Sequence, residues 1–284
     1  MVPKDRLHAL PGDALDAGFC ARACEGAQAV YHCMNPPYDA AAWAEIVPRL
    51  MDNLIAAAGG AGARLVVLDN LYMLGRPNGR PMNEDTPVNP CSRKGEIRAR
   101  AAERLLDAHR KGQVVAVAGR ASDFYGPRGT LTYLGDFFWK RALAGKEVWL
   151  PVDPDAVHTY HYIPDVAAGL AQLGCAHHDA LGRAWMLPCQ PAETLRELVE
   201  RMERVSGRKL SIARLSPWIV KLSAPFFPLE PIVLCAMCVY MLYSAVDYAR
   251  GLSLLGIVPL VVGVPLYVVN RLVTKAAPAA GAKE

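Results

Sequence analysis

Residues 91–104, CSRKGEIRARAAER, are the stretch of this sequence whose residue types could best handle protons or anions. They open a helical pattern and are rich in lysine and arginine. Lys94 and Arg98 are four residues apart, so on a helix their side chains share one face. An arginine keeps its proton in a protein, and a lysine accepts one only when it is desolvated. Because like charges at this spacing repel, the pair is better tolerated beside an anion such as a nucleotide phosphate. A solvated basic face is the alternative, and Tyr72 is the nearest phenol that could carry a proton instead.

These residues need a scaffold, and the first two-thirds of the 284-residue chain has the pattern of one. Short apolar runs alternate with longer helical patterns, which predicts an α/β fold with a doubly wound parallel sheet buried on both faces. Right-handed crossovers would bring the strand carboxyl ends, and the loops after Cys33, Leu68 and Gly119, to one edge where ligands bind. We expect strands within 5–16 and at 28–33, 64–70 and 113–122, and helices at 17–27, 39–63 and 94–112.

The remainder of the chain has two different characters. Residues 128–200 have a mixed pattern typical of a small substrate region, followed by an amphipathic helix that Thr194 caps and Gly207 ends. Residues 231–246 and 251–269 carry no charge and would span about 24 and 28 Å as helices. We therefore expect a transmembrane helical hairpin within 226–275, and a flexible tail at 276–284. Basic residues on both flanks would place the α/β domain in the cytoplasm; a buried hairpin on a cytoplasmic protein is the alternative.

Composition narrows the choice of function. The net charge of 31 − 27 = +4 is small and spread along the chain, so we expect no nucleic-acid partner. The eight cysteines show no zinc-ligand spacing, and we expect no metal. Reduced thiols in the cytoplasm are the simplest interpretation.

Seven segments in series resemble the extended short-chain dehydrogenase/reductase superfamily, in particular its NAD-dependent epimerase/dehydratase family. The resemblance implies a Rossmann-like fold, NAD or NADP as cofactor and a small-molecule substrate such as a nucleotide sugar. It also implies a possible homodimer formed through the helices that contain EIVPRLMDNL and KGEIRARAAERLL. The matching segments are PGDALD (11–16), AVYHC (29–33), ARLVVLDNLYMLG (63–75), PMNEDTPVNP (81–90), GRASDFYGPRG (119–129), HTYHYIPDVAAGL (158–170) and GRAWMLPCQPAETLRELVERMERVSGRK (182–209).

By resemblance, several residues fall where the family binds its dinucleotide. Asp13 and Ala14 match the pair that holds the adenine, with a turn or helix-cap aspartate as the alternative. Cys33 and Met34 match the loop that passes under the pyrophosphate and ribose. Two further residues match the loop that flanks the nicotinamide and substrate, namely Asp123 and Tyr125.

By the same resemblance, Asn70 matches the residue that hydrogen-bonds the reacting oxygen, and His158 stands near a substrate-binding arginine. The family places a tyrosine and a lysine where this chain has Lys94 and Arg98, so the catalytic candidates here are Asn70, Lys94 and Arg98, with Tyr72 as the alternative phenol. The usual proton relay is therefore not expected.

A second departure concerns the first βαβ unit, whose glycine-rich turn holds the pyrophosphate in the family. No such turn precedes residue 30, so we expect a sheet that lacks this unit, in either a fragment or a degenerate member. If the protein is active, the chemistry would be hydride transfer at a carbinol carbon. The alternatives are a non-catalytic binding or scaffold protein, or a fusion whose residues 230–284 resemble the end of an amino-acid permease.

Overall fold

A computed structural model describes residues 7–130, 132–216 and 218 of the chain. The chain divides into two units, Met1–Arg214 and Leu215–Glu284, and the parallel sheet with its helices lies in the first. Within the described residues, no helix has both the length and the apolar character needed to cross a membrane. The expected hairpin and tail, 226–284, lie outside the described residues.

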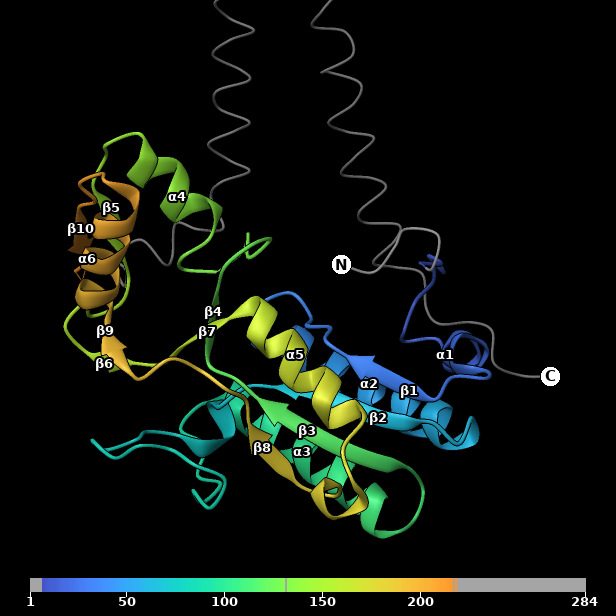
Figure 1. Ribbon diagram of the computed structural model, residues 1–284. Helices are drawn as coiled ribbons and strands as arrows, with labels where there is room; N and C mark the ends of the chain where they lie inside the picture. Colours follow the sequence, from blue (N-terminus) through green and yellow to red (C-terminus); the bar gives the residue numbers. More distant parts are fainter. Residues whose placement is uncertain (1–6, 131, 217, 219–284) are drawn as a thin grey trace, which may run out of the picture. The chain divides into compact units, whose positions relative to one another are not determined.

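A parallel sheet of four strands forms the centre of the first unit (Figure 1). The strand order is β1-β2-β3-β8, and every neighbouring pair is parallel. The strands are β1 (Ala29–His32), β2 (Arg64–Asp69), β3 (Val115–Arg120) and β8 (Ala184–Met186). The expected α/β fold with a parallel sheet is confirmed. The strands β1, β2 and β3 run parallel because a long helix connects each of them to the next.

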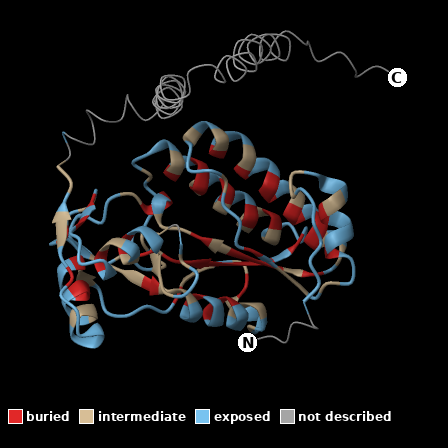
Figure 2. Cartoon of the chain, turned by 90° about the horizontal axis from the view of Figure 1, so that it is seen from above, coloured by how far each residue is buried: buried red, intermediate tan, exposed pale blue. Residues whose placement is uncertain are grey.

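Helices cover both faces of this sheet. Successive residues of β2 point to opposite faces, so Leu65 packs with α2 and α3 while Val66 packs with α5. Figure 2 shows the buried strands between these two helix layers. The small helix α1 packs on α2 through Cys20, Cys24 and Ala57. The helices are α1 (Ala17–Cys24), α2 (Ala40–Gly60), α3 (Arg93–Arg110) and α5 (Ile163–Gly174).

Side-chain caps set where the two long helices begin, and these caps position the loops at the sheet edge. The Asp39 carboxylate accepts hydrogen bonds from the amides of Ala41 and Ala42 at the start of α2. The Ser92 hydroxyl accepts one from the amide of Gly95 at the start of α3. Both caps satisfy amide groups that a helix leaves unpaired at its first turn.

The chain between β3 and the end of the unit adds short strands and a second core. β4 (Asp123–Tyr125) pairs in parallel with β7 (Tyr160–Tyr162), and β6 (Val157–His158) pairs antiparallel with β9 (Glu193–Thr194). β5 (Val148–Leu150) pairs in parallel with β10 (Ile212–Arg214). These two strands pack with α4 (Asp136–Leu143) and α6 (Leu195–Ser206) around a core of their own. Short 3-10 turns η2 (Tyr72–Leu74) and η3 (His178–Ala180) complete the unit.

The cap predicted for the last helix is confirmed. Thr194 and Glu197 form a reciprocal capping box, in which each side chain accepts from the other's backbone amide. Gly207 ends the helix with a left-handed φ of 64°, a conformation that costs glycine least.

One expected strand is not formed: residues 7–16 contain no strand in the structure. Leu7 and Leu10 are 63% and 66% exposed, and β1 is an edge strand whose Tyr31 is 45% exposed. A strand needs a neighbour for its backbone hydrogen bonds, and no described residues pair with the outer edge of β1. The prediction was wrong because a local sequence pattern does not reveal whether a neighbouring strand exists to pair with.

Candidate functional site

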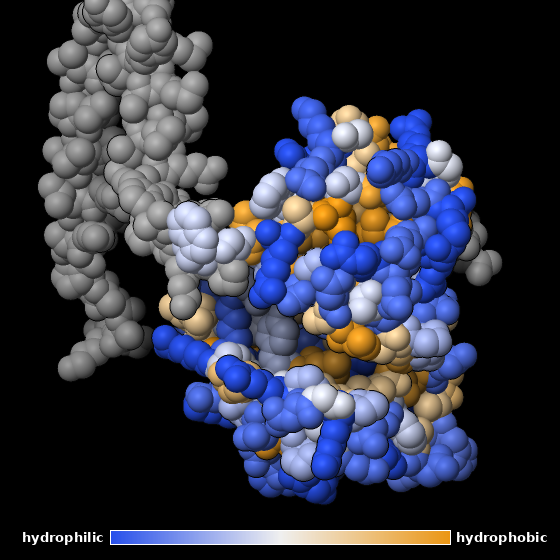
Figure 3. Space-filling model, turned by 90° about the vertical axis from the view of Figure 1, so that its left-hand side faces the viewer, coloured by the Kyte–Doolittle hydropathy of each residue, from blue (hydrophilic) through white to orange (hydrophobic). Residues whose placement is uncertain are grey.

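The carboxyl ends of β1, β2 and β3 meet at one edge of the sheet and carry polar side chains. The arrowheads of β1 and β3 point to the left in Figure 1. His32, Asp69 and Arg120 end the three strands, and each is more than nine-tenths buried. Figure 3, which looks at this side, shows the surface hollowed, with apolar residues inside the hollow. This edge is the candidate site.

A buried charge cluster forms its base. An Arg98 Nη1 lies 3.7 Å from the Asp69 Oδ1, and Arg120 is the partner of Asp69 across the strand register. Burial raises the pKa of the Asp69 carboxyl, while the two guanidinium groups and the Asn70 amide act against that rise. The Nε atoms of Arg98 and Arg120 are buried without a hydrogen-bond partner among the described residues. Two arginines and one carboxylate leave a net positive charge, which suits an anionic group.

Lys94 and Arg98 do not form a solvated basic face. The Lys94 Nζ donates to the Tyr38 carbonyl at 3.1 Å and lies 2.9 Å from the centre of the Tyr38 ring. The Arg98 guanidinium lies 4.7 Å from the centre of the buried Trp43 ring and donates to the Asn35 side chain. Both cations therefore tie α3 to the loop between β1 and α2.

The turn after β2 holds Asn70 and Tyr72 at the same edge. The Asn70 Oδ1 accepts from the Tyr72 amide at 3.0 Å, so the side chain also fastens its own turn. The Tyr72 and Tyr38 hydroxyl oxygens lie 3.3 Å apart. Burial raises the pKa of the Tyr72 phenol far above its ordinary value, and the hydrogen bond with Tyr38 adds to the rise. This environment favours the protonated form of the Tyr72 phenol.

The loop after β1 places Cys33 and Met34 beside this edge, and both are exposed. The His32 Nδ1 accepts from the Met34 amide at 3.3 Å. Burial, together with the charge of Arg98, lowers the pKa of His32 to about 4, so the ring is neutral and positions the loop. Although the Cys33 side chain is exposed, the protein around it partly desolvates the thiol, and this desolvation raises the pKa of Cys33.

Asp123 and His158 come together just beyond β3. The His158 Nε2 lies 2.8 Å from the Asp123 Oδ2, and each side chain is 42% exposed. Tyr125, two residues further along β4, packs its ring on that of Tyr162 with centres 5.4 Å apart. The Asp123 charge also contributes to the raised pKa of the Tyr72 phenol, which places the pair near the turn after β2.

Asp13 and Ala14 are not brought to the edge. The Ala14 carbonyl accepts from the Asn53 side chain at 3.0 Å, and the Asp13 carboxylate accepts from the Leu15 amide in a turn. Asn53 lies on α2 ten residues beyond Trp43, which is about 15 Å along a helix. The two residues therefore occupy the turn role left open as the alternative, apart from the other candidates.

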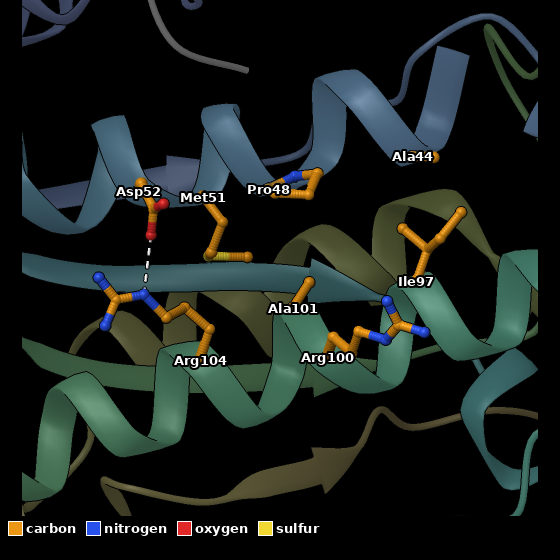
Figure 4. Close-up of a pocket in the computed structure, with 8 residues that line it drawn as sticks. All are labelled: Ala44, Pro48, Met51, Asp52, Ile97, Arg100, Ala101 and Arg104. Carbon is orange, nitrogen blue, oxygen red and sulfur yellow. Dashed lines mark hydrogen bonds and ion pairs between the residues drawn. The ribbon is translucent and has the colours of Figure 1, made fainter. Parts of the chain in front are cut away.

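A separate groove lies between α2 and α3 (Figure 4). The Arg104 Nε donates to the Asp52 carboxylate at 2.8 Å across it. Apolar residues cover most of the rest, and none of the candidate site residues lines the groove. Its lining is Ala44, Pro48, Met51, Asp52, Ile97, Arg100, Ala101 and Arg104.

Sequence reasoning missed Asp69, Arg120, Asn35 and Tyr38. A signal existed for the first two, because a charged residue that ends an otherwise apolar strand is buried at the carboxyl edge. Asn35 and Tyr38 lie in a loop, and no spacing rule connects them with α3.

Comparison with known proteins identifies the family of this chain. The model of the NAD dependent epimerase/dehydratase family matches residues 3–181. No curated protein matches the sequence.

Solved structures share the fold. A dTDP-glucose 4,6-dehydratase, DesIV of Streptomyces venezuelae with NAD bound, is similar at a TM-score of 0.60 and 21% identity, over 72% of this chain and 65% of that one. This chain therefore spans less than two-thirds of the DesIV length. A UDP-glucose 4-epimerase from Brucella ovis, in complex with NAD, is similar at a TM-score of 0.61 and 21% identity, over 73% of this chain and 72% of that one. RMD from Pseudomonas aeruginosa, complexed with NADPH, is similar at a TM-score of 0.62 and 18% identity, over 73% of this chain and 74% of that one.

Proposed function

This chain belongs to the NAD-dependent epimerase/dehydratase family, and on that premise we propose that it binds NAD or NADP along the carboxyl edge of β1–β3. The proposed reaction is hydride transfer on a sugar nucleotide or another secondary alcohol or ketone. The observation that carries the proposal is the gathering of Asn70, Arg98 and the Cys33–Met34 loop at that edge, where parallel α/β sheets bind nucleotides.

The residues present fit one half of a dinucleotide. Arg98 and Arg120 have buried, unpartnered Nε donors and a net positive charge, which suits the anionic part of the cofactor. Asn70 would orient the reacting oxygen, and Cys33 with Met34 would lie beneath the ribose. Within the described residues, no glycine-rich turn precedes β1 to receive a pyrophosphate. When bound, the cofactor supplies the hydride acceptor or donor, and the protein supplies orientation and charge.

Isothermal titration of the full chain with NAD⁺, NADH, NADP⁺ and NADPH tests the proposal. We expect binding to at least one of them, weakened at least tenfold by Arg98→Met. Arg104→Met is the matched control, because this arginine lies in the groove between α2 and α3. Asn35→Ala, which removes the Arg98 partner, is a milder second variant in case Arg98→Met unfolds. No heat from any of the four at millimolar concentration would overturn the proposal.

A non-catalytic binding protein is the second candidate, favoured by two observations. The phenol closest to Asn70 keeps its proton, and the lysine at the position of the family's tyrosine is engaged by Tyr38. The double change Lys94→Tyr with Arg98→Lys restores the family's pair. Binding of a dinucleotide without turnover, before and after this change, would favour the second candidate over the first.

Two associations remain proposals. For a homodimer, the groove between α2 and α3 is the surface on which we expect the second copy, and Met51→Glu should then shift the sedimentation coefficient toward that of a monomer.

For membrane attachment through 231–269, liposome flotation of the full chain against residues 1–225 is the test. Equal recovery of both in the soluble fraction would contradict it.

A further inference from the structure

The pair formed by Asp123 and His158 has the geometry of an acid–base dyad. The two residues are 35 positions apart and meet because β4 pairs with β7, which directly follows β6. The carboxylate engages Nε2 at 2.8 Å, which fixes the orientation of the ring. The Tyr160 ring packs against the imidazole edge to face, with ring centres 4.9 Å apart. The Nδ1 atom makes no hydrogen bond to any described residue and is left for a ligand.

Other histidines in the described residues do not share this arrangement. His161 has both ring nitrogens engaged, one by Ser122 and the other by the Leu187 carbonyl, and is buried. His32 is buried and neutral, and it fastens its loop. His177 does pair with Asp179 at 3.0 Å, but the two side chains are 90% and 85% exposed and follow α5, away from the strand carboxyl ends. That second pair is a natural control.

The tyrosines around the dyad are poorer bases than His158, because each phenol holds its proton at neutral pH. Tyr72 and Tyr160 keep their protons at neutral pH, because burial raises both phenol pKa values, that of Tyr160 to about 12. Burial likewise raises the pKa of Tyr133. The charged or titratable groups that face the dyad are Asp123 from β4, Tyr160 and His161 from β7, Glu193 from β9, Tyr72 after β2 and Tyr133.

We propose that His158, held by Asp123, is the catalytic acid and base of this site, in place of the absent tyrosine. The inference rests on the proposed function. In the oxidising direction, Nδ1 takes the proton of the substrate hydroxyl and the O–H electron pair becomes the second bond of the C=O group. When bound, the oxidised nicotinamide dinucleotide would accept the hydride from the same carbon. The Asp123 carboxylate stabilises the imidazolium that forms, and the reverse direction returns the proton to the ketone oxygen.

Modification of the full chain by diethyl pyrocarbonate, read by mass spectrometry, tests the placement without cofactor. We expect His158 and His177 to be ethoxyformylated and His161 to be protected. UDP-glucose or dTDP-glucose should slow modification at His158 at least fivefold and leave His177 unchanged. Equal modification of His158 with and without both sugar nucleotides would overturn the proposal.

Turnover of the same two sugar nucleotides tests the chemistry. His158→Gln should lower kcat/KM by about 10²–10⁴-fold. Asp123→Asn should cause a smaller loss, while His177→Gln and Asp179→Asn should match the wild type. A wild-type chain that binds no dinucleotide would overturn the proposed function and this inference with it. Dinucleotide binding together with full activity of His158→Gln would overturn this inference alone.

Discussion

Gly95→Ala should separate α3 from the turn after β2, and one close approach sets the size of the effect. A Cβ added to Gly95 would lie 2.5 Å from the Tyr72 carbonyl oxygen and 3.0 Å from the Pro90 Cβ. An ordinary contact begins at 3.4 Å, so α3 or the turn must move by 3.4 − 2.5 = 0.9 Å. Overpacking of this kind costs about 1–3 kcal/mol, and the gain in helix propensity offsets about 1 kcal/mol of it.

Gly60→Ala is the matched control, since Gly60 is also helical and its added Cβ would meet nothing within 4 Å. The gain in helix propensity is shared and largely cancels between the two variants. Urea unfolding followed by circular dichroism should therefore find Gly95→Ala less stable than Gly60→Ala by about 1–3 kcal/mol. That difference corresponds to a lower melting temperature by at least about 2–4 °C.

The same movement should weaken the proposed cofactor site, because Lys94 and Arg98 flank Gly95 on α3. A displacement of this size can cost about 100-fold in a step that depends on alignment. We therefore expect weaker dinucleotide binding by Gly95→Ala and unchanged binding by Gly60→Ala. If Gly95→Ala melts at or above the temperature of Gly60→Ala, the packing of α3 against the turn is not as described, and the reasoning fails.

Three further changes probe the elements that position the site. Arg98→Met should cost about 3–5 kcal/mol in urea unfolding because it leaves the buried Asp69 carboxylate without its ion-pair partner, with part recovered in the double variant with Asp69→Asn. The deficit should shrink on acidification, since protonation of Asp69 removes the unpaired charge; a deficit independent of pH would contradict this account. Asp39→Ala should destabilise α2 at neutral pH, because hydrogen bonds from backbone amides, that of Ala42 first, lower the pKa of Asp39. That contribution is present above the ordinary carboxyl pKa and is lost as the pH falls through the lowered one. The urea midpoints of variant and wild type should therefore converge as the pH falls through the lowered pKa; parallel curves would refute it. Trp43→Ala should cost about 3–5 kcal/mol, because the ring is fully buried under Arg98, and a loss below 1 kcal/mol would show the core is not packed this way.

The elements of this fold were readable from sequence because their signals are local. The apolar run RLVVLD becomes β2, and the reciprocal cap of Thr194 and Glu197 starts α6. Such patterns depend on residues within a turn or two of each other, so the chain specifies them before any tertiary contact forms. The seven matching segments likewise indicated the family without a structure.

Tertiary structure alone decided which residues face one another. It placed the Arg98 guanidinium over the Trp43 ring and near Asp69, although spacing on α3 was equally consistent with a solvated face. It also kept Asp13 away from the strand edge, since no neighbouring strand pairs with the chain before α1 among the described residues.

The dyad of Asp123 and His158 shows the same limit most clearly. Each residue lies in a short strand with no distinctive pattern, and 35 positions separate them. Sequence by itself determined strands β1 to β3, the long helices between them and the cap of α6, because their signals are local. Only strand pairing and burial, which depend on distant parts of the chain, decided which charges meet at the carboxyl edge.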